Sequence, residues 1–482
     1  MQTAAKSSSP AAMADWISAQ NALLRSDTPD WESCARLIEA SKAITREISP
    51  LDMQAPLDAF PFALTTAHPS TTGPAWVRFL AADKNLKLLL AEAWIVAARR
   101  CSEHDVAPEV TMRRWAEALD EAMADLTCTT RYDGFLIEWL RAGLAANLPM
   151  RPPDLPIPPS PPIATTPCDI VRQMGRVTLS RYVGSGSGTP ILIVHGLIGR
   201  QSVCDLEPDR SLVSALLARG CDVWVIDWGS PGKPDADQGF TEHVEGWLKD
   251  ACDLVQNTTN NRPALMGVCQ GGIFVLCYAA QRPDAVSGIA LTGTPVDFHA
   301  DLAGQQGYLN RLTRTLPRDV IDGLLAPSGS LPGATTGALF QAMTPGRTFA
   351  KYSIDLAAKL TKPEEMATFA RMEAWLADRP DLPGGVAREW LINLYQENAL
   401  IKDRFEIDGN PVRLANIEVP ILNIIAEKDH IVPPACSRAL KDYVPNAPYQ
   451  SIDVPSGHIG VFVSEAARER VAPTIADWLA KI

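Results

Sequence analysis

The sequence lacks the short signatures by which metal, nucleotide and redox-cofactor sites are usually recognised. It contains no HExxH, no CxxC pair, no GxxxxGK[ST] and no GxGxxG after a strand-like run. Such sites hold their ligands or phosphate-binding amides at fixed short spacings, so only a metal bound by residues far apart in the sequence would escape this test. We therefore expect the chemistry to use no metal and no bound cofactor.

The sequence also lacks a surplus of positive charge. Lysine and arginine total 44 against 56 aspartates and glutamates, which gives a net charge of −12 without any block of basic residues. Because nucleic-acid binding depends on neutralising backbone phosphates, we expect no nucleic-acid partner. A phosphorylated small molecule remains compatible with this balance, since a local basic patch is enough to bind it.

Neither a transmembrane segment nor a secretion signal is evident. No apolar run reaches the roughly 18 residues that a spanning helix needs, and Met1–Ala14 is mostly small and polar. The ten cysteines are scattered along the chain without a pairing pattern, which is typical of free thiols in a reducing compartment. We expect a soluble cytoplasmic protein with no transmembrane segment.

A change in composition divides the 482 residues into an N-terminal and a C-terminal part. Residues 149–167 read PMRPPDLPIPPSPPIATTP, and so many fixed φ angles predict an extended, polyproline-like linker. Residues 1–148 carry apolar stripes at helical spacing, for example Leu86, Leu89 and Leu90. We predict a separate helical N-terminal domain, which either serves as an ordinary packing domain or offers a face to a partner or particle.

After the linker, short aliphatic runs alternate with helical stretches, which is typical of a mostly parallel α/β sheet with helices on both faces. We assign 168–482 to one catalytic domain. The alternation stops between about 298 and 408, where we predict a helical cap inserted over the active site. The expected strands are Pro190–Val194, Asp222–Asp227, Pro263–Val268, Ser287–Leu291, Pro420–Ile425 and Gln450–Val454.

The motif Gly267-Val-Cys-Gln-Gly271 lies between a strand-like run and the helix-like stretch Gly272–Ala280. Glycines on both sides of a central residue permit the tight strand-to-helix turn that exposes a nucleophile. We therefore predict that Cys269 is the nucleophile, in the place usually taken by serine. The alternative interpretation is a glycine-rich turn around a buried thiol.

Two partners follow Cys269 in the order that α/β-hydrolase folds use. Asp429 comes after the strand that begins at Pro420, and His458 comes after the strand that ends at Val454. His430 is a weaker alternative to His458. Nucleophile, acid and histidine in this order predict an α/β-hydrolase fold with a Cys269–Asp429–His458 triad.

Backbone amides are expected to stabilise the oxyanion of the tetrahedral intermediate. The residue after the nucleophile supplies one N–H, which is that of Gln270, and the loop after the first strong strand supplies the other, near Leu197. His195 begins this loop. We interpret it as a positioning residue rather than as a base.

From about Pro167 onward the chain resembles polyhydroxyalkanoate synthases, especially the catalytic subunit of the short two-subunit class. The resemblance implies that Cys269 is the nucleophile, His458 the general base and Asp429 its acidic partner. The matching stretches are DLEPDRSLVSALLARGCDVWVIDWG at 205–229, GVCQGG at 267–272, TPVDF at 294–298, RMEAW at 371–375, NLYQENAL at 393–400, VPILNIIAEKDHIVPP at 419–434 and GHIG at 457–460.

The resemblance also implies a substrate and partners. The substrate would be an (R)-3-hydroxyacyl thioester of coenzyme A, polymerised to a polyester with release of coenzyme A, which is substrate and product rather than a cofactor. A homodimer, a second synthase subunit, the growing polyester chain and the surface of a polymer granule are the expected partners. The N-terminal domain has no counterpart in the short catalytic subunit.

Two other functions stay open at this point. An intracellular polyester depolymerase or thioesterase would share the elbow and the triad, and the pair His195-Gly196 is hydrolase-like. A non-catalytic granule-associated protein would retain the fold without the reaction, although the intact Cys, Asp and His set argues against it. Product analysis and labelling of Cys269 by a substrate-like thioester would separate the three.

Overall fold

The computed structural model describes residues 157–184, 186–300, 308–326, 328–343, 351, 359 and 362–482. The predicted helical domain over 1–148 and the linker up to residue 156 lie outside these residues. The chain divides into two compact units, one of residues 1–159 with 337–370 and the other of Ser160–Thr336 with Arg371–Ile482. The predicted domain boundaries therefore stay predictions, and the second unit is the one described below.

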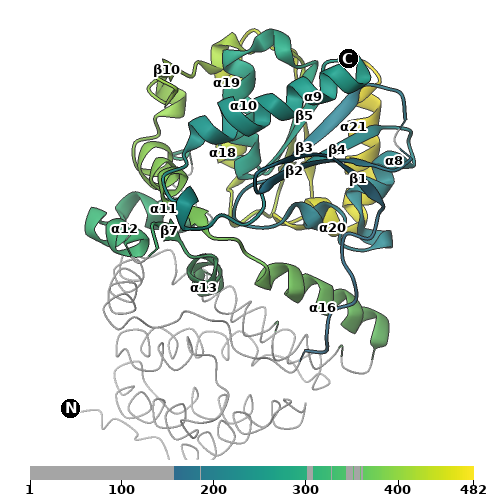
Figure 1. Ribbon diagram of the computed structural model, residues 1–482, viewed down its shortest axis with the longest axis horizontal. Helices are drawn as coiled ribbons and strands as arrows, with labels where there is room; N and C mark the ends of the chain where they lie inside the picture. The colour runs from purple at the N-terminus through teal and green to yellow at the C-terminus, as the bar shows by residue number, and fades with distance from the viewer. Residues whose placement is uncertain are drawn as a thin grey trace, which may run out of the picture. The chain divides into compact units, whose positions relative to one another are not determined.

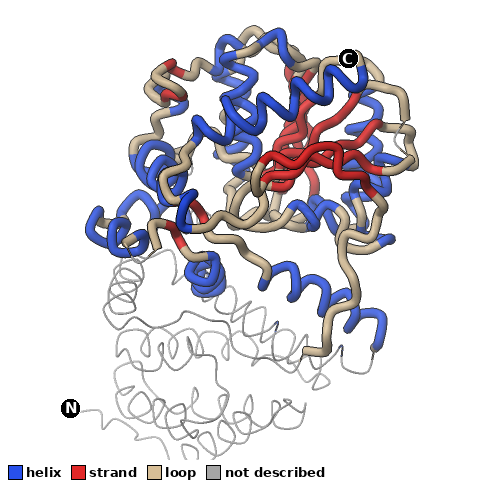
Figure 2. The backbone as a smooth tube through the Cα atoms, viewed as in Figure 1, coloured by secondary structure: helices blue, strands red, loops and turns tan. Residues whose placement is uncertain are grey.

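An eight-stranded sheet forms the centre of the second unit, in the order β1-β2-β4-β3-β5-β6-β11-β12. The strands of this sheet are drawn red in Figure 2. Every neighbouring pair from β4 to β12 is parallel, whereas β1 and β2 are antiparallel to their neighbours. The prediction of a mostly parallel α/β sheet is confirmed. The strands are β1 (Cys168–Met174), β2 (Val177–Tyr182), β3 (Pro190–Val194), β4 (Asp222–Asp227), β5 (Ala264–Val268), β6 (Gly288–Thr292), β11 (Ile421–Ala426) and β12 (Tyr449–Val454).

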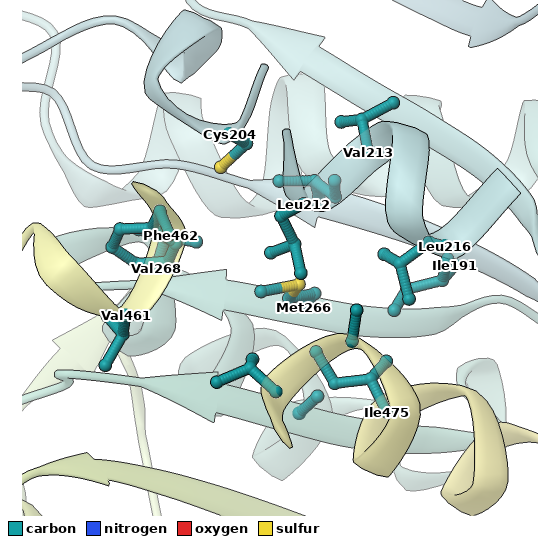
Figure 3. Packing of buried hydrophobic residues seen from close by; sticks show 14 of the residues in the cluster. Ile191, Cys204, Leu212, Val213, Leu216, Met266, Val268, Val461, Phe462 and Ile475 are labelled. Carbon is teal, nitrogen blue, oxygen red and sulfur yellow. The ribbon is translucent and has the colours of Figure 1, made fainter. Parts of the chain in front are cut away.

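Helices cover both faces of this sheet, as Figure 1 shows. On one face lie α8 (Leu212–Leu217), α20 (Gly460–Val463), η10 (Ala467–Val471) and α21 (Ala472–Leu479), and on the other η4 (Glu242–Leu248), α9 (Lys249–Thr259) and α10 (Gln270–Gln281). The first face holds a large apolar core, in which Met266 of β5 lies among Leu212, Leu216 and Ile475 (Figure 3). Buried on both faces, the parallel strands need the continuous aliphatic runs that the sequence supplies.

Between β6 and β11, the residues that the structure describes are mainly helical. Besides helices this segment forms two short antiparallel ladders, β7–β8 and β9–β10. Its role as a cap stays a prediction. Its elements are α11 (Tyr308–Thr315), α12 (Arg318–Leu325), β7 (Ser330–Leu331), α13 (Gly333–Met343), α16 (Pro363–Ala377), β8 (Leu382–Pro383), α17 (Gly384–Arg388), η7 (Glu389–Gln396), η8 (Leu400–Lys402), β9 (Glu406–Ile407), β10 (Asn410–Pro411) and η9 (Leu414–Asn416).

Short helical turns complete the fold. The remaining ones are η1 (Gln201–Cys204), η2 (Pro208–Arg210), η3 (Lys233–Asp235), η5 (Pro283–Ala285), α18 (Pro434–Arg438) and α19 (Leu440–Tyr443). Within the described ranges, no helix is both long enough and apolar enough to cross a membrane. The seven described cysteines are all free thiols.

The end of the Pro-rich segment, which belongs to the second unit, forms hydrogen bonds with later parts of the chain. The Thr166 amide and hydroxyl both donate to the carboxylate of Asp205, at 3.0 and 2.7 Å, and the Ala164 amide donates to the Asp205 carbonyl at 2.9 Å. Arg371 at the middle of α16 donates to the Pro162 carbonyl and forms an ion pair with the buried Glu207. These contacts fix the course of the chain before β1.

Candidate active site

Cys269 occupies the sharp turn between β5 and α10. Its φ of 53° and ψ of −119° lie outside the regions that a residue with a side chain normally adopts, which is typical of a strained functional turn. The Cys269 amide donates to the Thr292 carbonyl of β6 at 2.9 Å, and the side chain is only partly buried. The backbone therefore holds the thiol at the carboxyl end of the sheet, where it remains accessible.

Close backbone approaches explain the glycines around this turn. A Cβ atom on Gly271 would lie 1.9 Å from the Val194 carbonyl oxygen of β3, and one on Gly267 would lie 2.3 Å from the Gly272 Cα atom. No side chain fits at these distances, because real Cβ contacts are well above 3 Å. The glycines allow α10 to start directly against the sheet, and that start determines where the Cys269 side chain points.

His458 lies between Asp429 and Cys269. Its Nδ1 is 2.6 Å from Asp429 Oδ2, and its side chain also forms a hydrogen bond with the Cys269 thiol. The amides of Ile431 and Val432 donate to the other Asp429 oxygen at 2.9 and 2.8 Å. The structure thus brings together the three residues of the predicted triad, in the chain order and hydrogen-bond order that a nucleophile, a base and an orienting acid require.

The electrostatics around His458 favour its acceptance of a proton. Burial by itself lowers the pKa of His458, but the charges of Asp429 and Cys269 and the hydrogen bonds to both together raise it well above its usual value. Asp429 is only 1% exposed, so its charge acts on the imidazole with little screening by water. The histidine is therefore a strong base toward the neighbouring thiol.

The two predicted oxyanion donors follow two neighbouring strands: Leu197 lies in the loop after β3, and Gln270 lies two residues after the end of β5. Gln270 is the first residue of α10, so its backbone N–H has no acceptor within the helix. The Leu197 N–H is engaged: it donates to the side-chain oxygen of Gln270 at 3.1 Å, inside the protein. The structure therefore brings the two residues together, and the side-chain carboxamide of Gln270 accepts the backbone N–H of Leu197.

His195 is neutral at physiological pH. Burial is the main reason that the pKa of His195 falls to about 4. The hydrogen bond to Gly196 raises this pKa, whereas the charge of His458 lowers it further. The His195 Nδ1 donates to the Gly196 carbonyl at 2.9 Å, and its own carbonyl accepts from the Trp228 indole at 2.7 Å. These contacts hold the loop after β3, in agreement with a positioning role.

Sequence reasoning missed two residues near the site. Tyr395 of η7 is buried, and burial raises its pKa, with the charges of Cys269, Cys436 and Asp429 adding to the effect. Trp375 of α16 donates its indole N–H to the Arg200 carbonyl at 2.8 Å. Arg200 ends the loop at 195–200 that follows β3, which we call the oxyanion loop. Tyr395 and Trp375 both lie in stretches that carried the resemblance, NLYQENAL and RMEAW, and those motifs were the available signal.

In the part of the chain that the structure describes, no three His, Cys, Asp or Glu side chains gather as they would around a metal ion. The expectation that the chemistry uses no metal or cofactor stays a prediction.

Comparison with known proteins identifies first the class and then the family. A family model described as the alpha/beta hydrolase fold matches residues 189–465. Among solved structures, the monoacylglycerol lipase of Paleococcus ferrophilus is similar with a TM-score of 0.40 and 21% identity, over 63% of this chain and 98% of that chain. The match to the family model shows that the chain has the α/β-hydrolase fold.

Two curated relatives specify the family. The poly(3-hydroxyalkanoate) polymerase subunit PhaC of Synechocystis is 37% identical over 328 residues, which covers 66% of this chain and 85% of that protein. The protein of the same name from Allochromatium vinosum is 34% identical, over 60% of this chain and 80% of that protein. The chain belongs to the poly(3-hydroxyalkanoate) polymerase family.

Proposed function

We propose that this chain is a polyhydroxyalkanoate synthase, which polymerises (R)-3-hydroxyacyl-coenzyme A to polyester through an acyl thioester on Cys269. The observation that carries the proposal is the hydrogen-bonded series Cys269–His458–Asp429 in a member of this family. A cysteine suits the reaction, because exchange of one thioester for another preserves the transfer potential of the acyl group.

Acylation begins with transfer of the Cys269 thiol proton to His458. The thiolate attacks the thioester carbonyl of the substrate, and the backbone amides of Gln270 and Leu197 receive the negative charge that develops on oxygen. Collapse of the tetrahedral intermediate breaks the bond to the coenzyme A sulfur. The imidazolium returns its proton to that leaving thiolate, so free coenzyme A and acyl-Cys269 result.

Elongation is the step that needs the stronger base. The attacking group is a hydroxyl, either of the next monomer or of the chain end, and it is nearly un-ionised at neutral pH. His458 removes its proton as the oxygen attacks the thioester on Cys269, while Asp429 stabilises the imidazolium that forms. Collapse of this second tetrahedral intermediate breaks the bond between the acyl carbon and the Cys269 sulfur and leaves the new ester bond in the polymer. The Cys269 thiolate that is released takes the proton back from His458.

A hydrolase is the second candidate function, favoured by the pair His195-Gly196 at the start of the oxyanion loop. It would use the same acyl-Cys269 with water as acceptor. The products distinguish the two, because a synthase yields insoluble polyester with coenzyme A, whereas a thioesterase yields free 3-hydroxyacid. A protein without catalysis would yield neither.

The decisive test is purified protein with 3-hydroxybutyryl-coenzyme A, in which thiol release and insoluble polymer are followed together. Cys269→Ala should abolish both, and Cys269→Ser should retain a small residue of activity at most. Cys168→Ala is the matched control, since Cys168 is an exposed cysteine on β1, outside the site. Substantial polymer formation by Cys269→Ala would refute the proposal.

The relatives are named as polymerase subunits, and we propose that this chain too works with a helical partner at a polymer granule in the cytoplasm. Residues 1–148 are proposed to supply in cis part of what such a partner supplies. A shortened chain beginning at Ile157 keeps the described contacts of Ala164 and Thr166 with Asp205. It should show a longer lag or weaker granule association, partly restored by adding residues 1–148 in trans. Full rate without added lag, with normal granule localisation, would count against the role of residues 1–148.

A further inference from the structure

The contact between Gln270 and Leu197 is a polar interaction that the proposed reaction steps leave unexplained. The side-chain oxygen of Gln270 accepts the Leu197 N–H at 3.1 Å, and the Gln270 side chain is only 6% exposed. The donor amide follows β3 and the acceptor follows β5, 73 residues later in the sequence. The bond therefore joins the two loops that are expected to hold the oxyanion.

Close packing keeps the carboxamide in this place. A Cβ atom added to Gly196 would lie 3.0 Å from the Gln270 Cβ and 3.4 Å from its side-chain oxygen. The loop after β3 is itself held by the Trp228 indole at the His195 carbonyl and by the Trp375 indole at the Arg200 carbonyl. Because the loop is held at both ends, the Leu197 N–H keeps its direction when the carboxamide leaves.

We propose that the Gln270 carboxamide is a built-in occupant of the oxyanion site, which a substrate carbonyl has to displace before Cys269 can react. The proposal rests on the function proposed above, and it deepens that function by giving the side chain of Gln270 a role in addition to that of its backbone amide. The ligand that displaces the carboxamide is a thioester carbonyl oxygen.

The occupant removes a gain that the bound substrate would otherwise share with the transition state. A neutral thioester carbonyl is no better an acceptor than the carboxamide oxygen that it replaces, so substrate binding gains little from the Leu197 amide. The oxyanion is charged and accepts a much stronger hydrogen bond, so the transition state still gains from it. Because the cost of displacement is the same in both states, the occupant weakens substrate binding and leaves the rate from the bound complex unchanged.

Removal of the occupant should change the half-saturating substrate concentration rather than the maximal rate. Gln270→Met keeps the length of the side chain but removes the acceptor. Substrate and transition state then both gain the free energy that displacement had cost. The half-saturating concentration of 3-hydroxybutyryl-coenzyme A for acylation should fall roughly 3- to 10-fold, as expected for one neutral hydrogen bond. The maximal acylation rate should stay within about two-fold, because both states shift together.

Gln270→Glu gives the opposite change. A carboxylate holds the Leu197 amide more tightly than a carboxamide does, and it repels the developing oxyanion. Both the half-saturating concentration and the maximal rate should therefore become less favourable, with an overall loss of roughly 10-fold or more. Gln256→Met on α9 is the matched control, since Gln256 is an exposed glutamine outside the site.

The experiment is single-turnover acylation of Cys269 in the full chain, followed by intact-protein mass spectrometry over a range of substrate concentrations. If the parent and Gln256→Met form no acyl-protein, the proposed function fails. If they do, and Gln270→Met shows a lower maximal rate or an unchanged half-saturating concentration, the occupant proposal fails. Thermal unfolding of each variant identifies one that is misfolded, and Gln270→Glu then decides: acylation as efficient as the parent's overturns the proposal.

Discussion

The two halves of the candidate site are held in different ways. Cys269, Asp429 and His458 follow β5, β11 and β12, so the backbone of the sheet determines their places. The oxyanion loop at 195–200 follows β3 but is held by side chains that come from elsewhere in the sequence. The Trp228 indole donates a hydrogen bond to the His195 carbonyl, and the Trp375 indole donates one to the Arg200 carbonyl. The Arg200 side chain forms hydrogen bonds with Gly229 and Ser230 and an ion pair with Asp378.

This difference suggests a division of labour that mutation can test. Changes in the sheet-borne half should alter the chemical steps or the fold itself, because little else positions those groups. Changes in the side-chain-held half should alter how the substrate is received, because the loop can shift without moving the sheet.

The largest effect is expected at the base and its acid. His458→Gln should remove both acylation and elongation, since no other described group accepts the thiol proton from Cys269. Asp429→Asn should spare part of the acylation, because the imidazole alone can accept a thiol proton, but it should slow elongation by about 10²–10⁴-fold, since a hydroxyl is harder to deprotonate. Single-turnover acylation and steady-state polymerisation are compared on each variant, and equal losses of Asp429→Asn in both steps would show that the acid serves them alike.

Gly271→Ala should be the most damaging change to the fold of the sheet-borne half. The new Cβ would lie 1.9 Å from the Val194 carbonyl, so α10 and β3 would have to separate. We expect a loss of about 3 kcal/mol or more in the free energy of unfolding, measured by denaturant titration. Gly246→Ala is the control, since a Cβ there meets nothing within 4 Å. A Gly271→Ala protein as stable as the parent would mean that the elbow can relax.

Trp375→Phe tests the side-chain-held half. It removes the indole donor from the Arg200 carbonyl while keeping an aromatic ring. The loss of one hydrogen bond, about 1 kcal/mol, should raise KM roughly five-fold with little change in the maximal acylation rate. Trp478→Phe in α21 controls for the loss of ring volume away from the site. A fall in the maximal rate with KM unchanged would instead place the oxyanion loop with the chemical half.

The smallest effect on the reaction is expected at Glu389, where η7, the helix that carries Tyr395, begins; there the change is in stability. Burial raises the pKa of Glu389 to about 7, the Phe240 amide opposes this, and the charge of Glu242 adds to it. A folded-state pKa above the unfolded value means that the folded protein binds the extra proton, so stability falls as pH rises from about 4.5 to about 7. Glu389→Gln removes this cost. It should stabilise the protein by about 1–2 kcal/mol at pH 8, allowing for partial solvent screening, and by nothing at pH 4.

Thermal or chemical unfolding at both pH values measures the difference for Glu389→Gln. Glu465→Gln serves as the exposed control, and it should leave stability unchanged at either pH. If Glu389→Gln were no more stable than the parent at pH 8, the hydrogen bond from the Phe240 amide to the Glu389 carboxylate would have to offset the cost of burying its charge.

The sheet-borne half is also the half that the sequence predicts well. Buried parallel strands need unbroken aliphatic runs, and β3 and β4 match the predicted Pro190–Val194 and Asp222–Asp227. By contrast, β1 is almost entirely exposed, and its residues show no alternation of buried and exposed positions that would have indicated a strand. The helical stretch before β5 also has a feature that the sequence does not indicate, since it divides into the π-helix η4 and the α-helix α9.

The fastenings of the oxyanion loop could not be predicted in the same way. Trp375 and Arg200 are 175 residues apart, and Gln270 and Leu197 are 73 apart. Nothing in local propensity or periodicity specifies such a pair, because it exists only after the fold brings two distant elements together. The motif around Cys269 predicted where the thiol lies. The side chains that hold the neighbouring oxyanion loop could be identified only from the structure.

The free cysteines make the protein suitable for counting its own active sites. Burial raises the pKa of the Cys204 and Cys252 thiols to about 12 and also raises that of Cys277, so at neutral pH they carry almost no thiolate with which to attack an electrophile. Cys269 has a histidine beside it and a partly open side chain. A mild alkylating reagent at limiting concentration should therefore modify Cys269 ahead of these three. In the Cys168→Ala variant, which lacks the exposed cysteine of β1, the fraction of protein labelled in step with lost activity would then report how many molecules in a preparation are competent.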